Sequence, residues 1–492
     1  MRTGLFVALA MVAVVCSACG GGEEEGSGPG SGGGSPKPSV PVILVSLDTL
    51  RADRLGMYGG QEGVSPFLDA LAAESVVFSD CLSQSSNTAS SHKSLFTGQL
   101  VERHDHEKGR YRLDRYNIGT LLQAAGYESV AYAGGGFLHP ELGFGQGFEQ
   151  FVIENDRGGF RPRRGFRGIL PQVERWWQGR EKSRPFFLFL HSYDIHCPYW
   201  PGKPWRARFA GEYQGPLRLQ ELCGEEAFGQ LFAGEQAPGP EDLAYLRSMY
   251  DGGIAMADEL LGRFLEPLQE DGFLDRCLLI VTSDHGESLG EHNMVGHNFM
   301  WEEQLQVPLL IRFPGAEFGG TRCSEPVMLV DVLPTVLDYL DMPIPEAVQG
   351  ESLLPVLQRQ QSWLQDSESD TEASAAEATP AFDRLRVSKH LDLTAFRYDR
   401  RWKVVLRERP DRPAEVYLFD LETDPGESRN VAGTEQGQAA LGPILDRFQA
   451  WRESQAAGNE AARGPRLRPN IDSRLSGTLS ELGYTDFEGE EE

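Results

Sequence analysis

The chain has 492 residues, of which 40% are hydrophobic and 24% are charged. This length and composition allow one large core and a smaller appended domain. The formal net charge of −27 argues against attraction of the whole chain to nucleic acid or to anionic membranes. We therefore expect no nucleic-acid partner and an acidic, solvated surface.

The first residues have the pattern of an export signal. Arg2 precedes an uncharged apolar run over residues 5–15, which is too short to span a bilayer. Small residues before Cys19 resemble a bacterial lipoprotein cleavage site, so we predict a signal peptide over residues 1–18 and a lipid on Cys19. A plain secretory signal is the alternative. Either signal exports the chain to the cell envelope, facing the periplasm or the cell surface, and the lipid would anchor it to the membrane.

Residues 19–40 are rich in Gly, Ser, Glu and Pro and have no apolar periodicity, which predicts a flexible tether. Five further cysteines follow, and none of them forms a C-x-x-C pair. A zinc-finger or thioredoxin-type site is therefore not indicated, and an odd number leaves at least one of the five unpaired within the chain.

Two apolar runs end abruptly in acidic residues. They cover residues 41–48 and 277–287, and they lead to Asp48 and to Asp284 with His285. Such runs are typical of buried parallel strands, and open α/β sheets carry their sites at the carboxyl ends of these strands. We therefore expect Asp48, Asp284 and His285 to converge around one cation.

Between these runs, a polar stretch from Ser86 to Gly98 is predicted to enter a short helix that the glycine closes. Thr88 lies at the predicted helix entrance, where free backbone N–H groups and the helix dipole favour negative charge. We interpret Thr88 as a nucleophile that faces the cation. The alternative role of Thr88 is an ordinary helix N-cap.

Strand and helix signals alternate along the same region. Residues 65–71 and 120–125 have helical spacing with capping signals, whereas residues 76–78, 129–133 and 185–191 have the character of strands. This alternation predicts an α/β fold, with a mainly parallel sheet in a layered α/β/α domain.

A basic segment interrupts this acidic chain. Five arginines occur within eleven residues: Arg157, Arg161, Arg163, Arg164 and Arg167. The segment is either a solvated surface loop or a guide for an anionic substrate, because clustered charge can steer ligands against an unfavourable net charge.

The predicted catalytic domain, residues 41–356, ends at a change in composition. Residues 357–381 are dominated by Gln, Ser, Glu, Asp and Ala, which predicts an acidic low-complexity linker. Two strand-like segments and an apolar stripe of helical spacing then predict a small α+β subdomain over residues 382–453. We expect this subdomain to pack beside the site without supplying chemistry, and residues 454–492 to form a tail.

Three motifs carry a resemblance to a known family. They are Leu47-Asp48-Thr49-Leu50-Arg51-Ala52-Asp53, Thr88 followed by Leu95-Phe96-Thr97-Gly98, and Thr282-Ser283-Asp284-His285-Gly286-Glu287. In this order they resemble the sulfatase family of the alkaline phosphatase superfamily over residues 41–356. The resemblance implies a three-layer alkaline-phosphatase-like sandwich and a hydrolase of sulfuric or phosphoric esters.

The resemblance also implies one divalent metal ion. Asp48, Thr88, Asp284 and His285 would bind it, and coordination would activate the Thr88 hydroxyl. Sulfatases typically use Ca²⁺, but a nitrogen ligand also suits Mn²⁺ or Zn²⁺, and Mg²⁺ stays possible.

Three histidines match catalytic positions of the family. His196 corresponds to a histidine that contacts the anionic group of the substrate, and His191 is the alternative for this role. His297 lies in a segment similar to the one that supplies a basic residue near the leaving group. His92 lies in the nucleophile motif and is the third candidate.

The nucleophile motif departs from the family. Sulfatases oxidise a cysteine or serine in C/S-x-P-S-R to formylglycine, whereas this chain has Thr88-Ala89-Ser90-Ser91-His92. Threonine carries a methyl group on Cβ and cannot become that aldehyde. The Lys and His segment that follows in the family is also absent, because Gly134-Gly135-Gly136-Phe137 stands there. A threonine nucleophile is similar to those of phosphodiesterases, phosphonate hydrolases and phosphoglycerol or phosphoethanolamine transferases of the superfamily.

Three functions follow from this reasoning. The first is a metal-dependent hydrolase of sulfate, phosphate or phosphonate esters that acts through Thr88, with a sulfated or phosphorylated glycan, lipid or small molecule as its substrate. Within it, we predict faster turnover of phosphodiesters or phosphonates than of aryl sulfates, and loss of activity above about pH 6.5 if the histidines act as cations. The alternatives are a phosphotransferase of the cell envelope and a non-catalytic binding protein on the same scaffold.

Overall fold

The computed structural model describes residues 40–103, 116–154, 165–219, 238–367, 384–410 and 412–459. The predicted signal peptide, nearly all of the predicted tether and four of the five arginines in the basic segment lie outside the described residues. Among the described helices, none combines the length and the apolar character that crossing a membrane requires.

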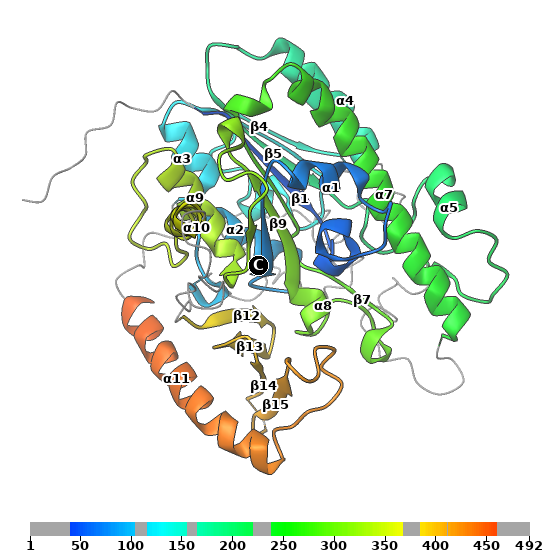
Figure 1. Ribbon diagram of the computed structural model, residues 1–492, viewed down its shortest axis with the longest axis vertical. Coiled ribbons are helices and arrows are strands. Elements are labelled where there is room, and N and C mark those ends of the chain that lie inside the picture. The colour runs from blue at the N-terminus through cyan, green and yellow to red at the C-terminus, as the bar shows by residue number, and fades with distance from the viewer. Residues whose placement is uncertain are drawn as a thin grey trace, which may run out of the picture. The chain divides into compact units, whose positions relative to one another are not determined.

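A mixed, mostly parallel sheet forms the centre of the catalytic domain (Figure 1). Its strands are β1 (Val42–Leu47), β2 (Val76–Leu82), β3 (Glu128–Ala133), β4 (Gln150–Ile153), β5 (Phe186–Ser192), β6 (Leu278–Thr282), β9 (Gln306–Arg312), β10 (Arg322–Cys323) and β11 (Val327–Met328). Their order is β10-β2-β9-β6-β1-β5-β3-β4, and β11 also pairs with β2. Because β1 is parallel to both β5 and β6, the carboxyl ends of these three strands meet at one edge.

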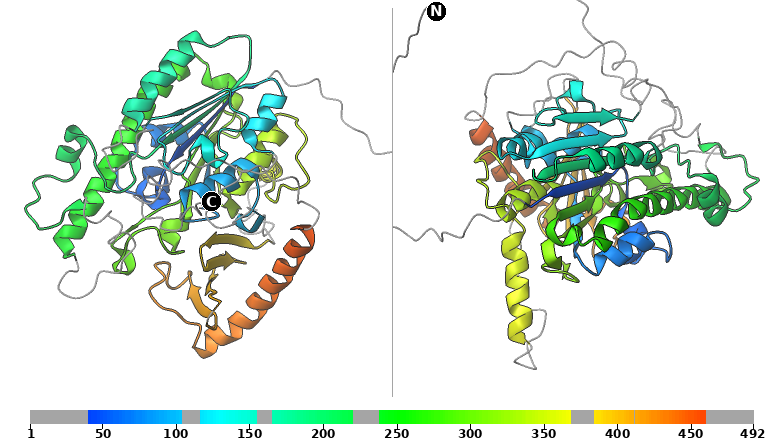
Figure 2. Two further views of the ribbon diagram at one scale, coloured as in Figure 1. Left: turned by 180° about the vertical axis from the view of Figure 1, so that it is seen from behind. Right: turned by 90° about the horizontal axis from the view of Figure 1, so that it is seen from above.

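Helices cover both faces of the sheet (Figure 2). Alternate side chains of β1 enter opposite cores: Val42 and Leu44 enter one, and Ile43 and Val45 enter the other. The first core also contains residues of α2 (Thr88–Thr97), α3 (Ile118–Ala124), α9 (Val332–Tyr339) and the start of α10 (Leu354–Ser367). The second contains residues of α1 (Pro66–Ala72), α4 (Phe166–Gly179) and α7 (Pro240–Glu270), and α5 (Lys203–Phe209) packs on α7. The predicted α/β/α layering is confirmed.

Three short elements complete the description of the catalytic domain. They are the paired strands β7 (Ser288–Leu289) and β8 (Val295–Gly296) and the helix α8 (Glu302–Leu305). All three follow β6 and precede β9, so they lie close in sequence to the acidic end of β6.

The C-terminal subdomain is a four-stranded antiparallel sheet with one long helix (Figure 1). Its elements are β12 (Arg386–His390), β13 (Leu393–Arg397), β14 (Trp402–Arg407), β15 (Glu415–Asp420) and α11 (Glu435–Asn459). Phe448 of α11 stacks on Phe396 of β13 with the ring centroids 3.9 Å apart. Leu393 and Ala395, on the other face, pack with Leu82 and other apolar residues of the catalytic domain.

A buried charge network joins the subdomain to the catalytic domain. Lys403 on β14 lies 3.0 Å from Glu302 of α8 and 2.7 Å from Glu427. Arg397 on β13 lies 2.8 Å from Glu302. Burial raises the pKa of Glu427 to about 7, although Lys403 opposes the shift. Removing one partner would leave a buried charge uncompensated. The network therefore holds β13 and β14 of the subdomain against α8 of the catalytic domain.

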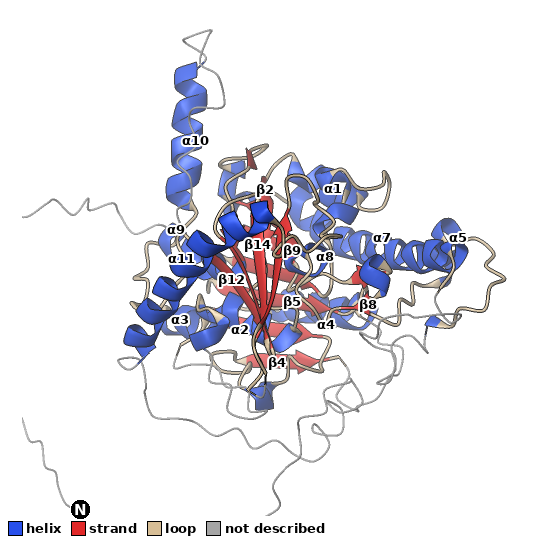
Figure 3. Cartoon of the chain, turned by 90° about the horizontal axis from the view of Figure 1, so that it is seen from below, coloured by secondary structure: helices blue, strands red, loops and turns tan. Residues whose placement is uncertain are grey.

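Two predicted boundaries are wrong. Residues 357–367, predicted as linker, continue α10, whose start is anchored by the buried Leu354 and Leu357. Gln, Leu and Arg in this stretch are good helix formers, which the composition argument overlooked. Figure 3 shows the rest of α10 standing away from the sheet. The helix α11 likewise continues to Asn459, past the predicted end of the subdomain at residue 453.

Candidate active site

Asp48 and Asp284 lie at the carboxyl ends of neighbouring strands. β1 and β6 pair in parallel with Ser46 opposite Thr282, so the acids that follow the two strands emerge side by side. Both side chains are fully buried. The backbone N–H of Thr49 donates to Asp284 Oδ1 at 3.2 Å and ties the two strand ends together.

His285 completes a cluster of three metal-type ligands. One ligand atom each from Asp48, Asp284 and His285 lies within 4.8 Å of the others. His285 Nδ1 donates to the carbonyl of Gly286 at 3.0 Å, which leaves the Nε2 lone pair to face the carboxylates. Burial lowers the pKa of His285 well below its usual range, so the ring is neutral, as a metal ligand must be.

The charges in this cluster fit a divalent cation. Burial, followed by the nearby charge of Asp48, raises the pKa of Asp284 well above its usual range. Two buried carboxylates repel each other unless a positive charge lies between them. Two hard oxygen donors and one imidazole nitrogen suit such a cation. The residues predicted to converge do so.

Thr88 is placed against this cluster by α2. Asn87, not Thr88, caps the helix, since the Asn87 side chain accepts from the N–H of Ser90 at 3.1 Å. Thr88 is therefore the first helical residue, and the alternative N-cap role is wrong. The Thr88 hydroxyl donates to Asp48 Oδ2 at 3.3 Å and lies 3.4 Å from His285 Nε2. A hydroxyl between two metal-type ligands is in position to bind the same ion.

His92 does not reach the place where a substrate would bind. It lies one turn after Thr88 and is fully buried. Its Nδ1 donates to the Thr88 carbonyl at 2.8 Å, and its Nε2 lies 2.9 Å from the Ser46 hydroxyl. Burial, and then His191, lowers the pKa of His92 well below its usual range. His92 is thus a neutral residue that positions α2, which corrects its prediction as a catalytic residue.

His191 is more directly involved than the sequence indicated. It is the next-to-last residue of β5, lies opposite Ser46 in the parallel register, and is fully buried. Its Nε2 donates to Asp48 Oδ2 at 3.1 Å. The same carboxylate oxygen accepts from Thr88, so His191 fixes the orientation of Asp48. The signal was its position at the end of a strand, but the sequence does not say which strands are neighbours.

His297 and His196 form a row of rings that continues from His285. The rings of His285 and His297 have centroids 4.3 Å apart, and those of His297 and His196 lie 5.5 Å apart. His297 Nδ1 donates to the carbonyl of Ser86 at 2.7 Å. Burial, and then His285, lowers the pKa of His297, so it is not a permanent cation. Of these three histidines only His196 is partly exposed, whereas His285 and His297 are buried.

Serine hydroxyls hold the backbone of the ligand segment, a role that sequence reasoning missed. The Ser283 hydroxyl donates to the carbonyl of His285 at 2.7 Å, and it accepts from the N–H of Leu50 at 2.9 Å. The Ser91 hydroxyl on α2 donates to the carbonyl of Asp284 at 2.7 Å. These bonds couple β1, α2 and β6 in one rigid unit.

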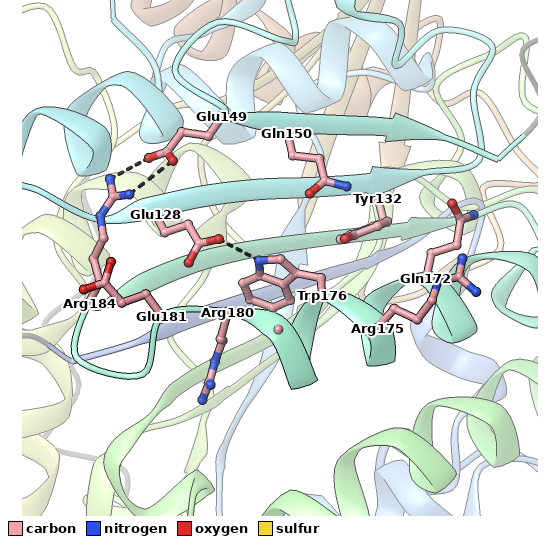
Figure 4. Close-up of a pocket in the computed structure, with 11 residues that line it drawn as sticks. Glu128, Tyr132, Glu149, Gln150, Gln172, Arg175, Trp176, Arg180, Glu181 and Arg184 are labelled. Carbon is pink, nitrogen blue, oxygen red and sulfur yellow. Dashed lines mark hydrogen bonds and ion pairs between the residues drawn. The ribbon is translucent and has the colours of Figure 1, made fainter.

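A surface groove of about 450 Å³ lies away from this cluster, between α4 and the strands β3 and β4 (Figure 4). Its charged and polar groups largely pair with each other. The Trp176 indole donates to Glu128 at 2.8 Å, and Arg184 makes two bonds to Glu149 at 2.5 and 3.1 Å. Neither the ligand cluster nor the three neighbouring histidines line the groove, so it is not the reaction site.

Residues 41–342 match the family model named Sulfatase, which is more than half of the chain. The chain belongs to the sulfatase family. Residues 290–453 also match the model for the C-terminal part of N-sulphoglucosamine sulphohydrolase. Proteins of this family are ester hydrolases that generally use a divalent metal ion, and this sulfatase-family chain is an enzyme of that class.

Curated relatives include both sulfatases and a protein of broader activity. The chain is 25% identical to a multifunctional alkaline phosphatase superfamily protein of Trinickia caryophylli, over 84% of this chain and 95% of the relative. It is 24% identical to an N-acetylglucosamine-6-O-sulfatase of Bacteroides thetaiotaomicron, over 65% of this chain and 71% of the relative.

Solved structures agree with the fold. The phosphonate monoester hydrolase of Agrobacterium radiobacter superposes with a TM-score of 0.67 at 21% identity, over 84% of this chain and 96% of that one. At this identity the likeness supports the sulfatase-family architecture, while the chemistry has to be argued from the residues of this chain.

Proposed function

We propose that this protein is a metal-dependent hydrolase of sulfate, phosphate or phosphonate esters, and that Thr88 is its nucleophile. One observation carries the proposal: the Thr88 hydroxyl lies 3.3 Å from Asp48 Oδ2 and 3.4 Å from His285 Nε2. A buried hydroxyl at the start of a helix, held between two metal-type ligands, has the surroundings that activate a poor nucleophile.

The ligands would be Asp48, Asp284, His285 and Thr88. A divalent ion bound there would neutralise the negative charge of the ester and favour the deprotonated hydroxyl. The ion is Ca²⁺ by family resemblance, and Mn²⁺, Zn²⁺ and Mg²⁺ are alternatives that the donor set allows.

The residues of the chain then carry the following steps. The Thr88 oxygen loses its proton to solvent and attacks sulfur or phosphorus. The bond from that atom to the leaving oxygen breaks, and the leaving oxygen keeps the electron pair and takes a proton from water. A water molecule then attacks the same sulfur or phosphorus atom of the Thr88 ester, which releases the anion and restores the hydroxyl. His191 keeps Asp48 oriented through its bond of 3.1 Å in both halves of the cycle.

The neutral histidines refine the earlier expectation on pH. Because burial lowers the pKa of both His92 and His297, these rings do not act as cations near neutral pH. The sequence predicted a loss of activity above about pH 6.5 if the histidines act as cations. We now expect His92 and His297 to cause no change in activity across this pH range. The preference for phosphodiesters or phosphonates over aryl sulfates stays a prediction, since a sulfated threonine has no aldehyde route of release.

The substrate class and the location are part of this proposal. The name of the N-acetylglucosamine-6-O-sulfatase relative supports an anionic ester of a glycan, although a lipid or a small molecule would suit the same site. Cys197 is disulfide-bonded, which supports export to an oxidising compartment, because disulfides persist there. A lipoprotein in the cell envelope remains the proposed location.

A substrate panel and one matched control test the proposal. The purified protein is assayed on aryl sulfate, phosphate monoester, phosphodiester and phosphonate esters with each metal. We expect Thr88→Ala to lose more than about 1,000-fold in kcat, which is about 4 kcal/mol, and Thr88→Ser to keep part of the activity. Thr97→Ala removes the same hydroxyl and methyl group from the other end of α2, and this variant should stay active. Full activity in Thr88→Ala would refute the mechanism.

A further inference from the structure

The groove between α4 and the strands β3 and β4 has the size of a ligand site. Its volume is about 450 Å³, within the range of about 300–1,000 Å³ that small-ligand sites occupy. Its lining begins with Glu128, the first residue of β3, and it follows the face of the sheet that α4 covers. The helix α2, which carries Thr88, packs on the opposite face. The groove is therefore separate from the reaction site.

Trp176 is held in one orientation in the middle of this groove (Figure 4). Its indole N–H donates to Glu128 Oε1 at 2.8 Å. Its ring meets Phe186 and Trp177 at interplanar angles of 83° and 66°, so neither of these rings stacks flat on it. Trp176 is partly exposed. The groove thus offers an aromatic surface whose position is already fixed before a ligand binds.

Polar side chains stand on both sides of Trp176. Glu149 lies on one side, where Arg184 holds it by two bonds of 2.5 and 3.1 Å. Gln172 and the exposed Arg175 lie on the other side. A carboxylate accepts at about four positions, and a guanidinium carries five N–H donors. A ligand above the indole therefore finds acceptors on one side and donors on the other.

The charges of the groove cancel. Three carboxylates and three guanidinium groups line it: Glu128, Glu149, Glu181, Arg175, Arg180 and Arg184. A lining of this kind has no field of one sign, which a ligand with several phosphate or sulfate groups would require. A neutral ligand with many hydroxyl groups can use both signs, because each hydroxyl donates and accepts.

We propose that this groove binds a neutral sugar ring of a glycan. One C–H face of the ring packs on Trp176, whose electron-rich face attracts the positive ends of the C–H bonds. The ring hydroxyls donate to the carboxylates on the side of Glu149, and they accept from Arg175 and Gln172 on the other side. This binding needs neither the metal nor Thr88, so the inference does not rest on the proposed function.

The test measures binding of defined hexasaccharides to the purified full chain. Cellohexaose, mannohexaose and chitohexaose are the neutral probes, and a heparin hexasaccharide is the anionic comparison. The neutral probes carry no sulfate or phosphate ester, so binding is read without turnover. Calorimetry gives the affinity, and saturation-transfer NMR shows which sugar protons contact the protein. Both are run with EDTA and with added Ca²⁺.

The variants are Trp176→Ala, Trp176→Phe and Arg175→Ala, each with a matched control. Trp200→Ala removes a tryptophan that is 47% exposed and does not line the groove. Glu174→Ala removes an exposed side chain of α4 that does not line it either. The unfolding midpoint in urea is measured for every variant.

We expect at least one neutral hexasaccharide to bind, with the same affinity in EDTA and in Ca²⁺. Trp176→Ala should weaken this binding more than about 10-fold, and Trp176→Phe should keep part of it, since a phenyl ring still stacks. Arg175→Ala should weaken it about 3- to 10-fold. Both controls should stay within about 2-fold of the wild type. The strongest saturation transfer should reach C–H protons on one face of a sugar ring.

Three results would overturn the inference. They are no binding of any neutral probe, equal binding by the wild type and both groove variants, and binding of the heparin hexasaccharide alone that high salt abolishes. If Trp176→Ala does not fold, Trp176→Phe and the exposed Arg175→Ala decide the question. Hexasaccharide binding by a protein that turns over no ester would refute the proposed function alone. Ester turnover without hexasaccharide binding would refute this inference alone.

Discussion

Replacing Asp284 by asparagine should separate two effects of this residue. One is its effect on the free energy of unfolding without metal, and the other is its contribution to metal binding. Asparagine has nearly the same shape, and its side-chain carbonyl can still accept the Thr49 N–H, which Asp284 Oδ1 accepts at 3.2 Å. The change removes one negative charge and one anionic ligand. We therefore expect opposite effects in the absence and in the presence of metal.

The structure sets the size of the first effect. Ligand oxygens of Asp48 and Asp284 lie within 4.8 Å of each other, and both side chains are fully buried. Two like charges at this separation would repel by about 3 kcal/mol at an effective dielectric constant near 20, and without metal the folded protein avoids this repulsion by favouring the protonated form of Asp284, whose pKa is raised. Without metal, Asp284→Asn should thus be more stable than the wild type, by up to about 3 kcal/mol.

The second effect follows from linkage. A metal at 100 times its dissociation constant stabilises the folded state by about 2.7 kcal/mol, and a variant that has lost a ligand loses most of this gain. The assay is urea unfolding of both proteins at one pH, with EDTA and with saturating Ca²⁺ or Mn²⁺. Asp271→Asn removes an exposed carboxylate and is the control. Equal stabilisation by metal in Asp284→Asn and wild type would refute the assignment, as would a variant clearly less stable than wild type in EDTA.

Three further perturbations have defined outcomes. His191→Gln should lower kcat by about 10-fold or more with little change in metal content measured by elemental analysis, since it frees the Asp48 carboxylate to reorient. Burial raises the pKa of Glu427 to about 7, so the folded state favours the protonated carboxyl. The contribution of this carboxyl to the stability of the fold is therefore lost as the pH rises through that value. The unfolding free energy of the wild type should therefore fall relative to Glu427→Gln between about pH 5 and about pH 8, as followed by urea titration. Phe448→Ala removes a buried ring that stacks at 3.9 Å and should cost about 3–5 kcal/mol in the same assay, while Phe448→Leu should cost less.

The sequence predicted that Asp48, Asp284 and His285 lie together, because these residues follow two separate strand signals. Asp48 and Asp284 both end apolar runs, and parallel strands bring such ends to one edge whatever their separation in the chain. The place of Thr88 beside this cluster was predicted from a different signal, a polar stretch that leads into a helix. The fold class followed from the same periodicity, because a run of buried strands that alternate with helices leaves few other arrangements.

The sequence could not predict which histidine does what, since this depends on strand order and on burial. His92 occupies a motif position, but it is fully buried and both of its nitrogens are engaged by Thr88 and Ser46. His191 was only the alternative to His196 for a contact with the substrate, yet it lies beside Asp48 because β5 is the neighbour of β1.

The bond from the Thr49 N–H to Asp284 links residues that are 235 positions apart. The metal centre therefore cannot exist on a nascent chain until more than half of it has been synthesised, and an N-terminal fragment that stops before β6 lacks two of the three ligands. If the protein is exported unfolded, it crosses the membrane without its ion. Which metal it carries is then decided by the ions available where it folds, and not by those inside the cell that makes it.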